Sequence, residues 1–235
     1  MNVQSMSVKP VSSQSVPSQT ELVGIIEASG SGEAEFFGYP EVANGLYLQQ
    51  DPEEFASFVH FMATKIPPAK LTLDIGIASG GQTKFLRDYF SAEKTIVVDL
   101  GEHPLFPHWE RIKKGVNSKI ILEIIGDSHA ESTREKLLPY ANQVDFAFVD
   151  GDHSYRGLRQ DIFLTKELLK LNGYMALHDT SAVADCRQVY DDLLSSRDFT
   201  LVRNYHNRFG ISIWKRINNK RKPNFWNRRF GIGKI

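Results

Sequence analysis

The sequence predicts one α/β domain built on a doubly wound, mostly parallel sheet of seven strands. Short apolar runs rich in β-branched residues alternate with amphipathic stretches of helical spacing over residues 71–196. Such alternation requires a parallel sheet with helices on both faces, because each crossover is right-handed. Two later strand-like runs follow each other without a helix, so we expect a closing hairpin whose last strand is antiparallel.

The first predicted helix precedes the sheet and begins at an Asp-Pro-Glu-Glu segment, residues 51–54. The Asp suits an N-cap, the Pro suits the first turn, and the glutamates favour the positive end of the helix dipole. A Pro-Pro pair at 67–68 ends this helix. Its apolar face is predicted by the helical spacing of Phe55, Phe58, Val59 and Met62.

The remaining elements follow from the same periodicities. The predicted parallel strands are 71–75, 95–98, 120–125, 146–149 and 174–177. The predicted helices between and after them are 82–91, 107–116, 129–140, 155–171 and 181–196. The closing hairpin is expected to pair 199–203 with 211–214.

We expect four segments and no second domain or internal repeat. Residues 1–20 read as a disordered leader, and 21–66 form an N-terminal segment that ends in the first helix. Residues 67–215 form the catalytic domain, and 216–235 form a basic C-terminal tail. From Lys215 onward the chain has eight basic and no acidic residues. A tail of this kind either stays solvated or contacts a polyanion or a membrane surface.

Composition favours a soluble protein of a reducing compartment. Hydrophobic residues make up 41% of the chain, and no apolar run is long enough to span a bilayer. The N-terminus lacks the basic start and apolar stretch of a secretory signal. A single cysteine, Cys186, allows no internal disulfide and no cysteine-based metal cluster, so we expect a cytoplasmic protein.

A glycine-rich loop follows the first strand and opens the next helix. It contains Gly76, Ser79, Gly80 and Gly81, preceded by Asp74. The spacing differs from the G-x-G-x-x-G of dinucleotide sites and from the phosphate-binding P-loop. An acid before the first glycine favours a ligand with a cationic or amine group over a pyrophosphate. Glycines of this kind allow a tight turn and a close approach to a ligand.

Acidic residues end the next two strands. Asp99 ends the second strand, where an acid binds ribose hydroxyls in doubly wound sheets. Asp127 and Ser128 end the third. Three acids at one edge with no basic partner nearby in sequence fit an adenosine that carries a positive sulfonium. Each piece taken alone is also compatible with an ordinary turn.

Acids and histidines also end the fourth and fifth strands. Asp150, Asp152 and His153 follow the fourth, and His178-Asp179 follow the fifth. Neighbouring parallel strands end at one crevice, so we expect Asp150 and Asp179, with His178 or Asp152, to hold a divalent cation. Oxygen ligands with at most one imidazole favour Mg²⁺ or Mn²⁺ over Zn²⁺. Two alternatives remain open, namely capping of the next helix and metal-free substrate binding.

The glycine loop, the strand-end acids and the antiparallel closing strand resemble the S-adenosylmethionine (SAM) motifs and Rossmann-like fold of class I methyltransferases. The stretch DFAFVDGDHSY and the His-Asp pair after LNGY resemble a narrower group. That group contains the macrocin and mycinamicin sugar O-methyltransferases and the cephalosporin-hydroxylase-like proteins. The resemblance extends from about Gln50 to Trp214, which is most of the chain.

The resemblance implies specific roles. The positions of Asp150 and of the pair His178-Asp179 bind Mg²⁺ in the sugar O-methyltransferases, and the position of His153 holds the base. This sequence departs from the group at His178, where those enzymes have a carboxylate. A neutral imidazole supplies less negative charge, so the departure implies weaker metal binding or a different ion.

The sequence therefore predicts a SAM-dependent, metal-assisted O-methyltransferase that acts on a hydroxyl of a sugar, glycan or small natural product. A nucleotide-sugar or NAD enzyme is disfavoured by the glycine spacing and the closing hairpin. A non-catalytic module that presents the basic tail is the other alternative. Specific nucleic-acid binding is not expected, since the fourth strand is not followed by an Asn/Asp-Pro-Pro-Tyr motif. The sequence carries no signal of an oligomeric state.

Overall fold

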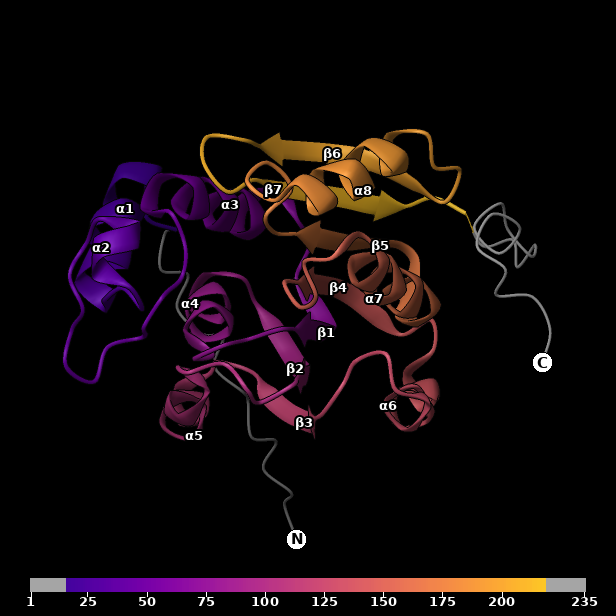
Figure 1. Cartoon of the computed structure of the whole chain (residues 1–235), viewed down its shortest axis with the longest axis horizontal. Coiled ribbons are helices and arrows are strands. Elements are labelled where there is room, and N and C mark those ends of the chain that lie inside the picture. The colour runs from indigo at the N-terminus through magenta and orange to yellow at the C-terminus, as the bar shows by residue number, and fades with distance from the viewer. Residues whose placement is uncertain (1–15, 219–235) are drawn as a thin grey trace, which may run out of the picture.

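The computed structural model describes residues 16–218, and within them the sheet has seven strands in the order β3-β2-β1-β4-β5-β7-β6 (Figure 1). All neighbouring pairs from β3 to β5 are parallel, whereas β7 is antiparallel to both β5 and β6. The predicted doubly wound sheet with one antiparallel strand is confirmed. The strands are β1 Ala69–Ile75, β2 Ala92–Asp99, β3 Lys119–Ile125, β4 Val144–Val149, β5 Leu169–Leu177, β6 Phe199–Tyr205 and β7 Ile211–Arg216.

Helices cover both faces of this sheet. On one face of the sheet, α1, α3 and α4 share a buried cluster with side chains of β4, β5 and β7. On the other face, α6, α7 and α8 share a second buried cluster with side chains of the strands. The helices are α1 Gln19–Ser29, α2 Ala34–Phe37, α3 Pro52–Lys65, α4 Gly81–Tyr89, α5 Trp109–Ile112, α6 Glu131–Leu137, α7 Tyr155–Leu168 and α8 Ala184–Leu194. Short 3₁₀ turns at Phe106–His108, Lys113–Gly115 and Leu138–Tyr140 flank α5 and α6. Within residues 16–218, no helix is long and apolar enough to cross a bilayer.

Some boundaries differ from the sequence-based expectation. The helix predicted over 155–171 ends at Leu168, because Leu169 already pairs with Val144 in the sheet. The helix predicted over 107–116 consists of α5 and two 3₁₀ turns. A short helical stretch flanked by proline and glycine has too few residues to sustain a regular apolar stripe.

The N-terminal segment contains a helix that periodicity alone did not predict. Helix α1 begins at Gln19, inside the expected leader, and its start is fixed by a reciprocal capping box between Ser18 and Glu21. Its buried residues Leu22 and Ile26 pack against α3. The Ser-x-x-Glu pattern at residues 18–21 was the signal in the sequence for the start of this helix. Residues 1–15 of the expected leader and 219–235 of the basic tail lie outside the described residues.

The start of α3 anchors the loop that leads into β7. The Asp51 carboxylate accepts a hydrogen bond from Glu54 N at 3.0 Å, which confirms the predicted cap. The buried carboxylate of Glu54 accepts hydrogen bonds from Phe209 N and Gly210 N, each at 3.0 Å. This loop in turn hydrogen-bonds the backbone that follows β5, so α3 supports that turn from the side of β7.

Replacing Glu54 with Ala should leave two buried backbone donors without acceptors. We expect the free energy of unfolding to fall by about 2–6 kcal/mol, at roughly 1–3 kcal/mol for each orphaned group. Urea unfolding followed by circular dichroism measures this loss. Glu53→Ala is the matched control, because Glu53 is exposed on the same turn and its loss should change stability by less than about 0.5 kcal/mol. Equal losses in the two variants would contradict the anchoring role.

Candidate active site

The residues singled out from the sequence gather at one edge of the sheet. Strands β1 to β5 run in the same direction, so their carboxyl ends and the loops that follow them lie together (Figure 1). In doubly wound sheets ligands bind at this edge, beside the point where the strand order reverses. Here the order reverses between β1 and β4, which carry the glycine loop and Asp150.

The glycine loop lies directly against the end of β4. Gly76 has φ of +74°, and a Cβ at this position would lie 2.1 Å from the carbonyl oxygen of Asp150. Gly80 has φ of +80°, and its Cβ would lie 2.0 Å from the ring of Trp109. Only glycine fits either position. These two glycines are therefore required by contacts within the chain. Their contact with a ligand, which the sequence analysis expected, stays a prediction.

Ser79 and Gly81 join the glycine loop to the N-terminal segment. The Ser79 hydroxyl donates to the carbonyl oxygen of Leu46 at 2.7 Å and accepts from Gly81 N at 3.0 Å. A Cβ on Gly81 would lie 2.1 Å from the same Leu46 oxygen. The segment before α3 thus covers the loop, and it would form one wall of a ligand-binding site there.

Asp99 holds the glycine loop through backbone hydrogen bonds. One carboxylate oxygen accepts from Ile77 N at 2.7 Å and Ala78 N at 3.2 Å, and the other accepts from Gly101 N at 2.6 Å. Ala78 has a positive φ of 47°, which is uncommon for a residue with a side chain. The carboxylate therefore fixes a strained turn between the ends of β1 and β2, and its role toward a ribose remains a prediction.

Asp74 has a basic partner, which comes from further along the chain rather than from its near neighbours in the sequence. Both its carboxylate oxygens accept hydrogen bonds from the Arg87 guanidinium, at 2.8 and 3.0 Å. The two side chains are fully buried between β1 and α4. Arg87 is distant in sequence and comes into contact because α4 packs back on its own strand. The geometry gives Asp74 a structural role beneath the loop.

Removing one partner of this buried ion pair leaves an uncompensated charge in the interior. We expect Asp74→Ala to lower the free energy of unfolding by about 3–5 kcal/mol. Asp88→Ala, next to Arg87 on α4, breaks only surface contacts with Lys84 and Asn117 and should cost about 0–1 kcal/mol. Chemical denaturation of both variants makes the comparison. A similar small loss in each would mean that the Asp74 pair does not stabilise the fold.

The loop after β3 is fixed by an acid that the sequence reading missed. Asp127 is exposed and accepts from His129 N at 2.8 Å, whereas the Ser128 hydroxyl donates to Asp161 at 2.6 Å. His129 Nε2 lies 3.2 Å from the same Asp161 oxygen, and the hydrogen bond and charge of Asp161 raise the pKa of His129. Asp161 is completely buried on α7. The available signal was an acid on the predicted apolar face, at helical spacing from Leu158 and Thr165.

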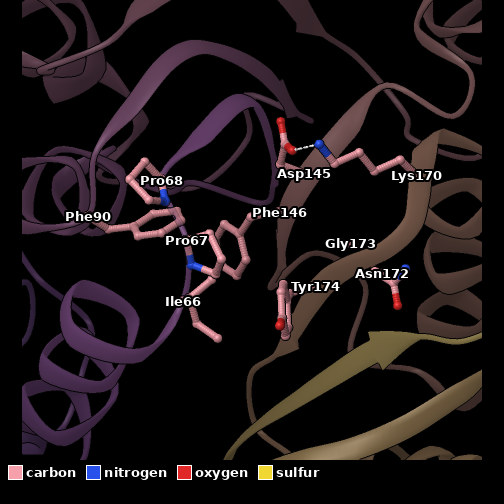
Figure 2. Close-up of a pocket in the computed structure, with 10 residues that line it drawn as sticks. All are labelled: Ile66, Pro67, Pro68, Phe90, Asp145, Phe146, Lys170, Asn172, Gly173 and Tyr174. Atoms are coloured by element: carbon pink, nitrogen blue, oxygen red, sulfur yellow. Dashed lines mark ion pairs between the residues drawn. The ribbon is translucent and has the colours of Figure 1, made fainter.

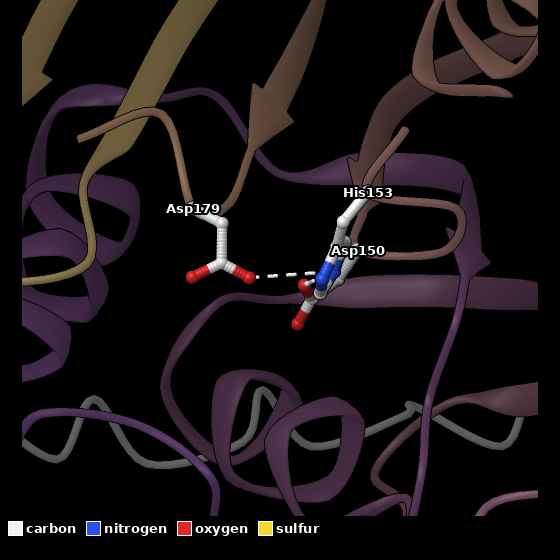
Figure 3. A group of neighbouring side chains, drawn as sticks. All are labelled: Asp150, His153 and Asp179. Carbon is white, nitrogen blue, oxygen red and sulfur yellow. Dashed lines mark hydrogen bonds and ion pairs between the residues drawn. The ribbon is translucent and has the colours of Figure 1, made fainter. Parts of the chain in front are cut away.

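Two carboxylates and two imidazoles meet at the ends of β4 and β5. Figure 3 shows three of these side chains, those of Asp150, His153 and Asp179. We call Asp150, His153, His178 and Asp179 the Asp–His cluster. His153 Nε2 lies 3.2 Å from Asp150 Oδ1 and 3.3 Å from Asp179 Oδ2. His178 Nδ1 lies 3.3 Å from each of the same two oxygens. The sequence-based expectation that these residues converge is thus met by the geometry.

Asp152 stands apart from the cluster. Its carboxylate accepts from Ser154 N at 2.8 Å, and the Ser154 hydroxyl accepts from Gly157 N at 3.0 Å. These contacts form the N-terminal cap of α7. The capping alternative therefore describes Asp152 and Ser154, and it leaves the four cluster residues free for another role.

The cluster charges stabilise one another. Burial lowers the pKa of His178, but the charges of Asp150 and Asp179 outweigh this effect and raise the pKa to about 10. Burial likewise raises the pKa of Asp150, but the two histidines outweigh it and hold the pKa below its usual range. The hydrogen bond from Asp150 raises the pKa of His153. The carboxylate charges therefore favour the protonated form of both imidazoles.

The backbone around the cluster is held in an unusual conformation. Asp179 has a positive φ of 58°, which asparagine and aspartate adopt more readily than most residues. Thr180 N and Ser181 N donate to Gly210 O and Phe209 O, at 3.2 and 2.8 Å. Such strain persists only where surrounding contacts enforce it, and it recurs at functional sites.

A separate pocket lies at the opposite edge of the sheet (Figure 2). It has a volume of about 200 Å³ and lies at the amino ends of β1, β4 and β5. Its walls include Pro68, Phe90 and Tyr174, and an ion pair between Asp145 and Lys170 lies at one end. Because strand amino ends lie opposite the Asp–His cluster, this pocket is not part of the candidate active site.

Comparison with known proteins agrees with this geometry. Residues 73–180 match a family model described as a methyltransferase domain, and this range contains the glycine loop and the whole Asp–His cluster. No curated protein sequence gave a significant match. The match covers less than half of the chain and shows that residues 73–180 are similar to a methyltransferase domain.

Solved structures of methyltransferases share the fold. The O-methyltransferase TomG from Streptomyces achromogenes, in complex with SAM, has a TM-score of 0.56 and 13% identity over 84% of this chain and 90% of that one. The N-methyltransferase NodS from Bradyrhizobium japonicum WM9, in complex with S-adenosylhomocysteine (SAH), has a TM-score of 0.52 and 15% identity over 71% and 87%. The CurJ carbon methyltransferase has a TM-score of 0.52 and 14% identity over 74% of this chain and 57% of that one. At these identities the likeness concerns the fold alone.

Proposed function

We propose that the protein is a SAM-dependent O-methyltransferase that uses the Asp–His cluster to bind and deprotonate an acceptor hydroxyl. The observation that carries this proposal is the contact between Gly76 and Asp150, which sets the glycine loop against the cluster. A cofactor at the loop and an acceptor at the cluster would then be neighbours. Proximity of this kind supplies most of the rate of a methyl transfer between two bound partners.

The cofactor assignment uses the ends of β1, β2 and β3. We place the SAM ribose at Asp99, its adenine beside Asp127 and Ser128, and its methionine part beside the glycine loop. An ionised carboxylate offers about four acceptor sites, and the backbone uses three of those on Asp99. One site is left for a ribose hydroxyl. The exposed Asp127 carboxylate is likewise free to accept from an adenine amine.

The chemistry is an in-line displacement at the SAM methyl group. The acceptor oxygen bonds to the methyl carbon while the bond from carbon to sulfur breaks, and SAH leaves with the electron pair. His153 takes the proton of the acceptor hydroxyl. Its side chain is half exposed, so it is within reach of an incoming acceptor, and its contact with Asp150 makes it a stronger base.

The cluster offers ligands for a divalent ion at the place where the resembled enzymes bind Mg²⁺. Asp150, His178 and Asp179 would hold it, since they offer two carboxylate oxygens and a buried imidazole nitrogen that has no hydrogen-bond partner. When bound, such an ion orients an acceptor oxygen and lowers the pKa of its hydroxyl. The expectation of Mg²⁺ or Mn²⁺ rested on one imidazole at most, and two imidazoles converge here.

The acceptor class is argued from the chemistry of the site. The methyltransferases that share the fold are named for oxygen, nitrogen and carbon acceptors, so the fold does not choose among them. A hydroxyl needs a base, and a carboxylate-supported histidine supplies one. The resemblance to sugar O-methyltransferases and the fold shared with TomG, an enzyme of tomaymycin synthesis, favour a hydroxyl of a sugar, glycan or small natural product.

Cofactor binding is tested by isothermal titration with SAM and SAH. We expect a dissociation constant in the micromolar range, about −8 kcal/mol. Asp99→Asn should weaken SAH binding at least about tenfold, equivalent to about 1.4 kcal/mol, because it removes the charge that accepts the ribose hydroxyl. Glu102→Gln is the control, since Glu102 is exposed on the same loop. Unchanged SAH affinity in the Asp99 variant would place the ribose elsewhere.

Turnover is tested by transfer of labelled methyl from SAM to a panel of sugars and small hydroxylated molecules. His153→Gln should lower kcat by about 10²-fold or more, the usual contribution of a general base. SAH affinity should stay within about twofold of the wild-type value, because His153 lies outside the cofactor site. His60→Gln on α3 controls for the loss of a histidine. If the His153 variant turns over normally, the proton has another acceptor.

A further inference from the structure

We propose that the Asp–His cluster is a four-coordinate site for a transition-metal ion of the Zn²⁺ type, and that it discriminates against Mg²⁺. Asp150, His178 and Asp179 are the fixed ligands, and His153 marks the exchangeable fourth position. The inference deepens the proposed function, and the catalytic use of the ion rests on it. Binding of the ion itself is independent of methyl transfer and is tested separately.

The donor atoms select the class of ion. The cluster brings together two carboxylate oxygens and two imidazole nitrogens. Imidazole is a preferred ligand of Zn²⁺, Co²⁺, Ni²⁺ and Fe²⁺, whereas Mg²⁺ is held by oxygens and keeps several waters. Replacement of a carboxylate by His178, together with the approach of His153, therefore moves the donor set from the Mg²⁺ type to the Zn²⁺ type.

The four spacings between nitrogen and oxygen match those of a tetrahedron. The four distances from nitrogen to oxygen are 3.2, 3.3, 3.3 and 3.3 Å. With Zn²⁺ bonds of about 2.0–2.1 Å, adjacent corners of a tetrahedron lie about 3.3–3.4 Å apart. With Mg²⁺ bonds of about 2.0–2.1 Å, adjacent corners of an octahedron lie about 2.9 Å apart. Asp150, His153 and Asp179 each place one donor atom within 4.8 Å of the other two, so one ion can reach these three together. His178 Nδ1 lies 3.3 Å from both carboxylates, and it would complete the site by a shift of its ring toward the ion.

His178 supplies a second, independent observation. Its side chain is 5% exposed, and Nδ1 has no hydrogen-bond partner although two carboxylate oxygens lie 3.3 Å away. The ring packs beside Phe148 and Phe209, with centroid distances of 6.3 and 6.0 Å. Its Nδ1 lies 3.3 Å from carboxylate oxygens of Asp150 and Asp179. A buried nitrogen left unpaired costs stability, and an ion at the centre of the cluster would pair it.

The four side chains differ in exposure in a way that separates fixed from exchangeable ligands. His178, Asp179 and Asp150 are 5, 11 and 17% exposed, whereas His153 is 45% exposed. Catalytic Zn²⁺ sites have three protein ligands and leave the fourth position to water or substrate. His153 lies at that corner on the solvent side. An acceptor oxygen that takes this corner would have the displaced imidazole beside it, as its role as a base requires.

The first experiment uses the untagged full-length protein after treatment with a chelator. Titration with Co²⁺ should give one bound ion per chain and the intense visible absorption of four-coordinate Co²⁺. Competition should show Zn²⁺ and Co²⁺ bound at least about 100-fold more tightly than Mg²⁺, a difference of about 2.7 kcal/mol. Weak absorption typical of six-coordinate Co²⁺, equal affinity for Mg²⁺, or no binding would overturn the proposal.

A matched substitution tests the ligand set. His178→Asp exchanges the buried nitrogen for oxygen, so Zn²⁺ affinity should fall at least tenfold and Mg²⁺ affinity should rise. Asp179→Asn should bind neither Zn²⁺ nor Mg²⁺, and this variant tests the ligand set if His178→Asp does not fold. His60→Gln and Cys186→Ser should bind Zn²⁺ normally, since burial raises the pKa of the Cys186 thiol to about 12 and keeps it protonated. Unchanged metal selectivity in His178→Asp would contradict the assignment.

SAH titration of the same samples separates the two proposals. If SAH binds and no transition-metal ion does, only the present inference fails. If the ion binds and SAH does not, the site holds a metal and the proposed methyl transfer fails.

Discussion

The close packing of β1 against β4 at their carboxyl ends is the constraint on which the site depends. Gly76 has no room for a side chain, because its Cβ would lie 2.1 Å from the Asp150 carbonyl oxygen. The glycine loop and Asp150 are therefore set at a fixed separation by backbone contact. Both loops are short, and both follow buried strands that pair in register. The pairing of the strands thus sets the relative positions of the proposed cofactor and acceptor sites, and no flexible side chain is needed to align them.

The negative charges of the acids at this edge are balanced by three different kinds of partner, and the kind of partner indicates the role of each acid. Asp74 lies deepest and has a guanidinium partner, so its charge is fully used within the fold. Asp99 is balanced by three backbone N–H groups, which fixes the loop and leaves acceptor capacity for a neutral hydroxyl. Asp150 and Asp179 are balanced by imidazoles. Of the three partners, imidazole gives up its proton most readily and can then bind a metal ion, so only Asp150 and Asp179 lie beside groups that exchange a proton for a cation.

Periodicity and strand-end chemistry were sufficient to predict the topology of the sheet and the convergence of Asp150, His153, His178 and Asp179. Both follow from rules that act along the chain or between neighbouring strands. Contacts between distant segments could not be predicted in this way. Arg87 reaches Asp74 only when α4 folds back on β1, and Asp161 reaches Ser128 only when α7 packs beneath the loop after β3. A buried acid on a predicted apolar face indicates that a partner exists, but the partner is identified by packing.

The histidine at position 178 changes what the cluster needs in order to fold. Three carboxylates at this distance would repel one another, so a site of that kind is costly without a cation. Two carboxylates beside two imidazoles repel one another less than three carboxylates do, so the cluster depends less on a metal. A divalent ion then competes with protons for the imidazole nitrogens. Because the pKa values of both histidines are raised, metal binding competes with protonation and should weaken as pH falls. Imidazole thus lowers the dependence of the fold on the ion, and it favours an ion that binds nitrogen strongly enough to displace the protons.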